Sequence, residues 1–467
     1  MTSTHGSATL DRERLRGLAE TVTGEVLTPG TDGYDDARHV FFRHLDQTPA
    51  VIVQPRDTDD TAAAVAFAQA NGLEIAVRGG GHSGAAHSTV EGGLVIDLRH
   101  LDSVEIDIDN RTARVGGGAT AGAVTVALAE HGLVLGFGDT DSVGVGGITL
   151  GGGVGFLSRL HGLTIDNLLA VELVTAEGRV VVADADQHPD LFWALRGGGG
   201  NFGVVTRFTF RLHRVEQVLG GMLILPATAD TIAGFVRHAQ EAPDELTCIV
   251  NVMPAPPMPF LEPAQHGQLV IFALLTFVGT AAEAEPVLAP FRALAPPLAD
   301  LLQEMPYAGM FQPEPDDYHP VAAGRNGYAD DVDGAGAQLV LDTLTAQLAK
   351  PEVQMAVVQL RPLGGAIARV RTDATAYAHR QRALMLNVAA IVSRVEELEA
   401  QLPWLETLKA ALCDGTPGGY ANFVYDDGPG RIHDIYPPDT YTRLAQVKAQ
   451  WDPDNTFHRN HTVLPAV

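Results

Sequence analysis

A run of glycines in the stretch VRGGGHSG, residues 77–84, constrains the fold of this chain more than any other feature. Its letters match G-x-G-x-x-G, the fingerprint of a dinucleotide-binding turn. A turn of that kind opens a helix whose N-terminus faces the pyrophosphate. The residues before the run predict a strand (50–54), a helix (58–71) and a strand (73–78), but those after it, as far as residue 119, predict three further strands and no helix. The sequence therefore excludes a Rossmann phosphate loop here.

Glycine is abundant elsewhere in the chain as well, with 50 residues gathered in a few runs. Clustered glycine indicates backbone that lies close to a ligand, close to another strand, or in a tight turn. A second match to the fingerprint, at Gly198, Gly200 and Gly203, also leads into a strand. Because glycine is so frequent, neither match is specific by its spacing alone.

The character of the sequence changes near residue 217 and again near residue 405. A chain of 467 residues is too long for one simple core, so we expect two domains, or one large domain with an insertion. After residue 217 the glycine runs stop, and the pattern predicts a helix over 228–241 and strands over 268–278, 354–365 and 382–392. After residue 405 it predicts a helix, a strand over 420–427 and a last helix.

The charge balance excludes several classes of partner. Lysine and arginine number 31 against 57 aspartates and glutamates, a formal net charge of −26. Such a surface repels phosphate backbones and anionic membranes, so we expect neither nucleic-acid nor membrane binding, and local backbone donors would have to hold any anionic cofactor.

The sequence lacks the signals of several other classes of protein. The two cysteines, Cys248 and Cys413, predict no disulfide framework, and His82 and His87 lack a third ligand nearby, so we expect no metal site. Hydrolase, zincin and P-loop motifs are absent. No signal peptide and no long apolar run is recognisable, which favours a soluble cytoplasmic protein.

Four stretches in the same chain carry a family resemblance. They are VRGGGHSG (77–84), DSVGVGGITLGGGVGFLSRLHGLTIDNL (141–168), DLFWALRGGGGNFGVVT (190–206) and the tail with YANFVYDD (420–427) and YTRLAQVKAQWDPDNTFHRNH (441–461). Together they resemble the FAD-linked oxidases of the berberine bridge enzyme group, in the vanillyl-alcohol oxidase/PCMH superfamily, and among them the bacterial members that tailor natural products. The resemblance extends from about Gly24 to Val463.

The resemblance implies an α+β fold. It consists of a PCMH-type FAD-binding domain, built from two α+β subdomains, and an inserted substrate domain, an antiparallel sheet backed by helices. On this chain the FAD-binding domain would take residues 1–217, with its core at about 47–217, the substrate-binding domain 218–405, and a C-terminal return that completes the FAD-binding domain 406–467.

The resemblance also implies how FAD is held. The family's loop histidine bonds covalently to the 8α carbon of the flavin, and His82 stands at that position; the alternative is a loop histidine that only donates to a phosphate. Some members add a cysteinyl link where this chain has Thr140, so we expect a single link. Val143 stands where oxygen-reactive members often carry valine, which favours an oxidase; the alternative is that Val143 is a packing residue. The cofactor-binding residues expected by this resemblance are Gly79, Gly80, Gly81, His82, Ser83, Thr140, Val143, Gly144, Gly147, Gly152, Gly153, Val205, Tyr420, Asn422 and Asn460.

The family reaction is hydride transfer to flavin, with a base that takes a proton from the substrate. Asn387 follows the pair His379-Arg380 at a position where relatives place a Glu or Gln, but an asparagine can only orient a substrate. The base role then moves to a tyrosinate, first Tyr420, then Tyr377 or Tyr425, although each could equally be a half-buried packing residue.

The expected function is an FAD-dependent oxidase that acts on a small alcohol, lactol, amine or phenolic secondary metabolite and passes electrons to O2, giving H2O2. One alternative is an oligosaccharide oxidase that forms a C1 lactone, and a further one is a flavin-binding protein without turnover. With aromatic residues at 6% and three tryptophans, the composition favours a hydrophobic metabolite over a sugar. We expect a monomer or a homodimer.

Overall fold

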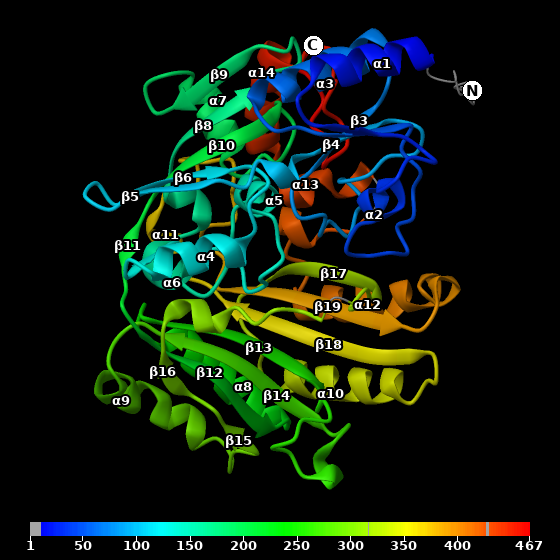
Figure 1. The fold of residues 1–467 in the computed structure, drawn as a ribbon. Coiled ribbons are helices and arrows are strands. Elements are labelled where there is room, and N and C mark those ends of the chain that lie inside the picture. Colours follow the sequence, from blue (N-terminus) through cyan, green and yellow to red (C-terminus); the bar gives the residue numbers. More distant parts are fainter. Residues whose placement is uncertain (1–10, 316, 426–428) are drawn as a thin grey trace.

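The computed structural model describes residues 11–315, 317–425 and 429–467, which form two stacked lobes (Figure 1). The first lobe begins with a four-stranded sheet of order β1-β2-β4-β3, in which β2, β4 and β3 are parallel. The predicted strand–helix–strand before the glycine run is confirmed, and Asp57 caps its helix. The elements here are α1 (Arg12–Thr21), β1 (Glu25–Leu27), α2 (Tyr34–Arg38), β2 (Val51–Gln54), α3 (Thr58–Ala70), β3 (Ile75–Arg78) and β4 (Leu94–Asp97).

A five-stranded antiparallel sheet of order β5-β6-β10-β8-β9 completes this lobe. No helix follows the glycine run before β4, as the sequence predicts. The glycine-rich stretch after residue 141 does contain a short helix, α5. The elements are β5 (Val104–Asp107), β6 (Thr112–Gly116), α4 (Ala121–Ala129), β7 (Leu133–Val134), α5 (Val145–Gly151), α6 (Ser158–His161), β8 (Leu168–Val174), β9 (Val180–Asp184), α7 (Pro189–Leu195), β10 (Val204–Arg211) and β11 (His213–Arg214).

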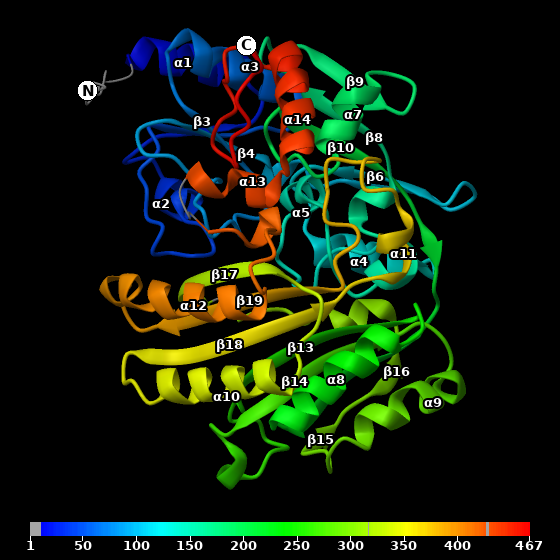
Figure 2. The same ribbon diagram turned by 180° about the vertical axis from the view of Figure 1, so that it is seen from behind.

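The second lobe is one large antiparallel sheet of order β15-β12-β14-β13-β18-β19-β17, with β16 beside β12. Helices α8, α10 and α12 cover the face away from the first lobe (Figures 1 and 2), and their apolar residues form one core with the sheet. The elements are β12 (Val218–Pro226), α8 (Ala229–Glu241), β13 (Leu246–Pro254), β14 (Leu269–Phe277), α9 (Ala281–Arg292), β15 (Ala299–Asp300), β16 (Gln303–Met305), β17 (Val321–Ala329), α10 (Gly334–Leu348), β18 (Val353–Pro362), α11 (Gly365–Arg369), β19 (Leu384–Val392) and α12 (Leu402–Leu412). The uncovered face of β18 and β19 turns toward the first lobe.

The chain then returns to the first lobe, where α13 (Ile432–Ile435) and α14 (Pro438–Trp451) lie, the latter against α7 (Figure 2). The strand predicted over 420–427 is wrong for its described part: a 3-10 turn, η7 (Ala421–Phe423), stands there, and 426–427 lie outside the described residues. The turn forms because the backbone N–H of Phe423 bonds to the Tyr420 carbonyl at 2.8 Å and that of Tyr420 to Asn326 Oδ1 at 2.7 Å. These donors therefore do not join a strand ladder.

Candidate flavin and substrate site

A cavity of about 480 Å³ lies between the lobes. Most of the residues expected to bind a cofactor line it; they are Gly79, Gly80, Gly81, His82, Ser83, Thr140, Val143, Gly144, Gly147, Val205, Tyr420, Asn422 and Asn460. Asn387 lines it from β19. Gly152, Gly153 and Tyr377 do not line it; they lie behind Tyr420, whose hydroxyl accepts from the Gly153 N–H at 3.0 Å.

The first wall is built by two glycine loops that touch backbone to backbone. A Cβ on Gly80 would lie 2.3 Å from the Gly144 nitrogen, and one on Gly144 would lie 2.1 Å from the Gly80 nitrogen. Any side chain at either position would therefore push the loops apart. Gly81 has φ +75°, a backbone conformation that favours glycine. Gly80, Gly81 and Gly144 are thus required for the shape of the wall, whereas a Cβ on Gly147 would meet nothing within 4 Å.

His82 is fixed at the edge of this wall. Its ring stacks on Phe41, with centroids 4.2 Å apart and planes 21° from parallel. Its Nε2 lies 2.9 Å from Ser142 Oγ, and that oxygen lies 2.5 Å from Glu314 Oε2. Burial lowers the pKa of His82 to about 4, so the ring is neutral at neutral pH.

The facing wall comes from the second lobe and is polar. Gln359 and Arg361 lie two apart on β18, and Gln359 pairs in register with Asn387 on β19. Arg361 Nη2 donates to Asp139 Oδ2 of the first lobe at 2.6 Å, and Arg361 Nε donates to Gln359 Oε1 at 2.7 Å. Among the described lining residues, Asp139 is the only carboxylate.

Sequence reasoning missed Gln359, Arg361 and Asp139. A signal for the first two was present, because residues two apart on a strand share a face. In the apolar run around VVQLRP, the spacing of Gln359 and Arg361 places both polar side chains on one side of a buried strand. Asp139 directly precedes Thr140, but nothing local distinguishes it from other loop aspartates.

Of the three tyrosines proposed as bases, Tyr420 and Tyr377 are buried and Tyr425 is half-buried. The Tyr420 hydroxyl accepts from the N–H groups of Gly153 and Val154 and from Asn422 Nδ2, at 3.0, 3.2 and 2.9 Å. Those donors favour the phenolate, yet burial is the largest influence and raises the pKa of Tyr420. Burial likewise raises the pKa of Tyr377, and it raises that of Tyr425 to about 12. This direction opposes a tyrosinate at neutral pH.

Several buried polar atoms of the cavity wall lack a hydrogen-bond partner among the described residues. They are Ser88 Oγ, the Tyr436 hydroxyl, Asn460 Oδ1 and Asn387 Oδ1. Buried polar groups in proteins are normally bonded, so such a set in one cavity indicates a polar ligand. Together with the glycine wall, these atoms fit a large cofactor with phosphate and ring heteroatoms.

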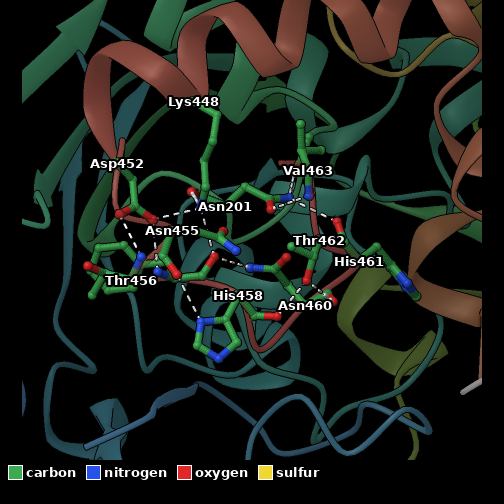
Figure 3. A network of polar contacts seen from close by, with 12 residues as sticks. Asn201, Lys448, Asp452, Asn455, Thr456, His458, Asn460, His461, Thr462 and Val463 are labelled. Atoms are coloured by element: carbon green, nitrogen blue, oxygen red, sulfur yellow. Dashed lines mark hydrogen bonds and ion pairs between the residues drawn. The ribbon is translucent and has the colours of Figure 1, made fainter. Parts of the chain in front are cut away.

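The tail that carries Asn460 is held by a buried polar network (Figure 3). Lys448 Nζ donates to Asp452 Oδ2, to the Asn201 carbonyl and to the Phe457 carbonyl, at 2.6, 2.7 and 2.9 Å. Asn460 Nδ2 donates to the same Phe457 carbonyl at 3.0 Å. Thr462 Oγ1 donates to backbone carbonyls of the same tail, those of His458 and Asn460.

Two family models match this chain. An FAD-binding domain model matches residues 49–184, and a berberine and berberine-like model matches residues 419–463. The chain is 30% identical over 462 residues to (R)-6-hydroxynicotine oxidase of Paenarthrobacter nicotinovorans, covering 95% of this chain and 97% of that protein. The chain belongs to the berberine-bridge-enzyme-like family of FAD-linked oxidases.

Solved structures agree with this family. A 6-hydroxy-D-nicotine oxidase from Arthrobacter nicotinovorans superposes with a TM-score of 0.84 at 27% identity, covering 95% of this chain and 98% of that one. Glucooligosaccharide oxidase from Acremonium strictum, described with a 6-S-cysteinyl, 8α-N1-histidyl FAD, gives 0.85 at 25% identity, covering 97% and 100%. The family resemblance, the α+β PCMH-type fold and the assignment as an FAD-linked oxidoreductase are therefore confirmed.

The described parts of the chain (11–315, 317–425, 429–467) contain no helix long and apolar enough to cross a membrane.

Proposed function

We propose that this berberine-bridge-enzyme-like protein is an FAD-dependent oxidase that takes a hydride from a small alcohol, lactol, amine or phenol and passes the electrons to O2, giving H2O2. We further propose that FAD is attached through His82 alone, because Thr140 offers no thiol at the other position. The observation that carries the proposal is one cavity with a neutral, fixed histidine on one wall and a polar row of Gln359, Arg361 and Asn387 on the other.

The glycine wall supports FAD binding in a strongly acidic protein. Successive backbone N–H groups of residues 79–83 offer donors to pyrophosphate oxygens without a basic surface. The unpartnered Ser88, Tyr436 and Asn460 atoms supply further polar contacts within the same cavity. Val143 lines the cavity as well, and we assign it the role of leaving room for O2.

When bound, the flavin supplies the two-electron acceptor for a hydride. The chain must then orient the substrate and remove its proton. Asn387 Oδ1, buried and unpartnered, is placed to accept from a substrate O–H or N–H. For the proton we propose Asp139 in place of the tyrosines, because it is the only carboxylate among the described lining residues and Arg361 holds it in position. Tyr420 is then a support that fixes the backbone of Gly153 and Val154.

An oligosaccharide oxidase is the second candidate. Hydrogen-bonding side chains in a row, as Gln359, Arg361 and Asn387 are, suit sugar hydroxyls. Phe42, Phe423 and Tyr425 line the same cavity and suit the ring of an aromatic or apolar metabolite. Peroxide release measured across oligosaccharides, secondary alcohols, cyclic amines and phenols distinguishes the two.

The cofactor proposal has a direct test. Protein precipitated with acid should keep its yellow colour in the pellet, and His82→Ala should release flavin to the supernatant. Once a substrate is found, Asp139→Asn should lower kcat/KM by about 10²-fold or more while the flavin spectrum stays the same. Full activity in Asp139→Asn would exclude Asp139 as the base. Monomer or homodimer, and a cytoplasmic location, stay predictions.

A further inference from the structure

His82 is held by a hydrogen-bonded chain that joins the two lobes. Ser142 belongs to the loop of residues 135–144 in the first lobe, whereas Glu314 belongs to the segment that leads into β17 of the second lobe. Ser142 Oγ lies 2.9 Å from His82 Nε2 and 2.5 Å from Glu314 Oε2. His319 on the same segment donates from Nδ1 to the Phe41 carbonyl, 3.0 Å away, so the segment also holds the residue whose ring stacks on His82.

The donors in this chain can be assigned from chemistry. Ser142 has a single hydroxyl hydrogen and donates it to Glu314 Oε2. The serine oxygen can then only accept, and His82 Nε2 must carry the proton that it donates. In a neutral imidazole the other nitrogen, Nδ1, consequently keeps a free lone pair. Nδ1 makes no hydrogen bond to any described residue, and His82 lines the cavity.

We propose that Ser142 and Glu314 form a proton relay by which this protein attaches FAD to its own His82. The proposal rests on the proposed covalent link at that residue. Ser142 and Glu314 select the tautomer with a nucleophilic Nδ1 and accept the Nε2 proton as the bond forms, so that neither residue needs to touch the flavin.

The chemistry balances with O2 as oxidant. The flavin's 8α methyl carbon loses one proton, a bond forms between that carbon and Nδ1, and the Nε2 proton of His82 passes through Ser142 to the Glu314 carboxylate. The two electrons left on the flavin ring go to O2, which takes up two protons and leaves as H2O2. The sum is FAD, histidine and O2 giving histidyl-FAD and H2O2. Glu314 is half-buried and can return its proton to solvent.

The arrangement has a consequence for the order of assembly. Glu314 lies in the second lobe, so the relay is complete only when both lobes are folded against each other. FAD that binds the glycine wall of an incompletely folded chain would therefore remain unattached. A positioning role of this kind is separate from catalysis on the substrate.

The test measures attachment and needs no substrate. Apoprotein is produced in a riboflavin-starved host and mixed with excess FAD, and samples are precipitated with acid over time. Covalent flavin is read by gel fluorescence and intact mass, and peptide mapping locates it. The variants are Glu314→Gln and Ser142→Ala. The matched control is Asp317→Asn, which removes an exposed charge from the same segment. Non-covalent FAD binding, measured by flavin fluorescence before attachment, shows that each variant is folded.

We expect attachment in Glu314→Gln and Ser142→Ala to be slower by about 10²-fold or more, the usual contribution of a positioned proton acceptor, and unchanged in Asp317→Asn. Formate should restore part of the rate in Glu314→Ala and leave the wild type unaffected, a response that a purely structural role for Glu314 would not give. Wild-type rates in both relay variants would overturn the relay and leave the His82 link intact. A wild-type protein without flavin on the His82 peptide would instead overturn the link itself.

Discussion

Replacement of Lys448 by methionine should destabilise the first lobe and loosen the flavin cavity. The ammonium is fully buried and makes hydrogen bonds to Asp452, to the Asn201 carbonyl and to the Phe457 carbonyl (Figure 3). It thus joins the glycine run of residues 197–203, the last helix and the tail at one point. Methionine fills a similar volume but offers no donor.

The magnitude follows from what the substitution leaves behind. Asp452, also fully buried, would keep the N–H donors of Thr456 and Phe457 but lose Lys448, the one cation paired with it among the described residues. Breaking a buried ion pair by removing one partner costs about 3–5 kcal/mol. The unpaired Asn201 and Phe457 carbonyls act in the same direction, so we expect a loss near the upper end of that range. Lys448→Met/Asp452→Asn should recover part of it, because the amide is neutral and its oxygen still accepts.

The assay is chemical denaturation of both variants beside Lys350→Met, a lysine in the second lobe whose loss should change the free energy of unfolding by less than about 0.5 kcal/mol. In a His82→Ala background, Lys448→Met should also weaken FAD binding, since Gly199, Gly200 and Asn460 line the cavity. A loss of less than about 1 kcal/mol in the free energy of unfolding would refute this reasoning. So would a double variant that is less stable than Lys448→Met, because the unpaired Asp452 charge would then not be the main cause of the loss.

Three further predictions concern the cavity and the pH response. Gly80→Ala should abolish FAD binding, because its Cβ would lie 2.3 Å from the Gly144 nitrogen; fluorescence titration measures this, and wild-type affinity would show that the loops can separate. Thr140→Cys, whose side chain would line the cavity, should keep flavin covalent even with His82→Ala, as read in acid precipitates. Burial lowers the pKa of His379 to about 4, so the unfolded chain binds more protons below about pH 6.5, and stability should fall by about 1.4 kcal/mol per pH unit for this residue between there and pH 4. His379→Gln should flatten thermal unfolding against pH over that range, and an unchanged slope would contradict the assignment.

Local patterns predicted the first lobe well where they were strong. The strand, helix and strand before the glycine run are apolar segments separated by an Asp57 cap and by Gly72, and they stand within two residues of the prediction. Helix α5 was not predicted, and the strand predicted over 420–427 was wrong in its described part, for a common reason. Helix α5 forms in a glycine-rich stretch because Val145 and Ile148 are buried in the lobe's core, and Tyr420 leaves the strand because its donors bond elsewhere. Tertiary contacts override weak local preference in both cases.

Only part of the site could be predicted from the sequence. The predictable residues lie in local motifs, and the others meet only across the two lobes. His82 and the glycines lie in short sequence motifs, and all residues of one motif belong to the same loop. Asp139 and Arg361 meet at 2.6 Å although 222 positions separate them, and their pairing depends on how the two lobes stack. No local pattern can encode such a contact, so the sequence can indicate Gln359, Arg361 and Asn387 on their strands but not the pairing of Arg361 with Asp139.

One loop of the first lobe therefore connects both proposed tasks, flavin attachment and proton removal from the substrate, to the second lobe. Asp139 reaches the guanidinium of Arg361, and three residues later Ser142 reaches the carboxylate of Glu314. Thr140 and Val143 line the cavity from the same stretch. A shift of the lobes would break both contacts together, since they hold the loop to opposite charges on one neighbouring lobe. Substitutions at the lobe interface should consequently impair flavin attachment and substrate orientation together. Substitutions within the core of either lobe should affect one of the two without the other.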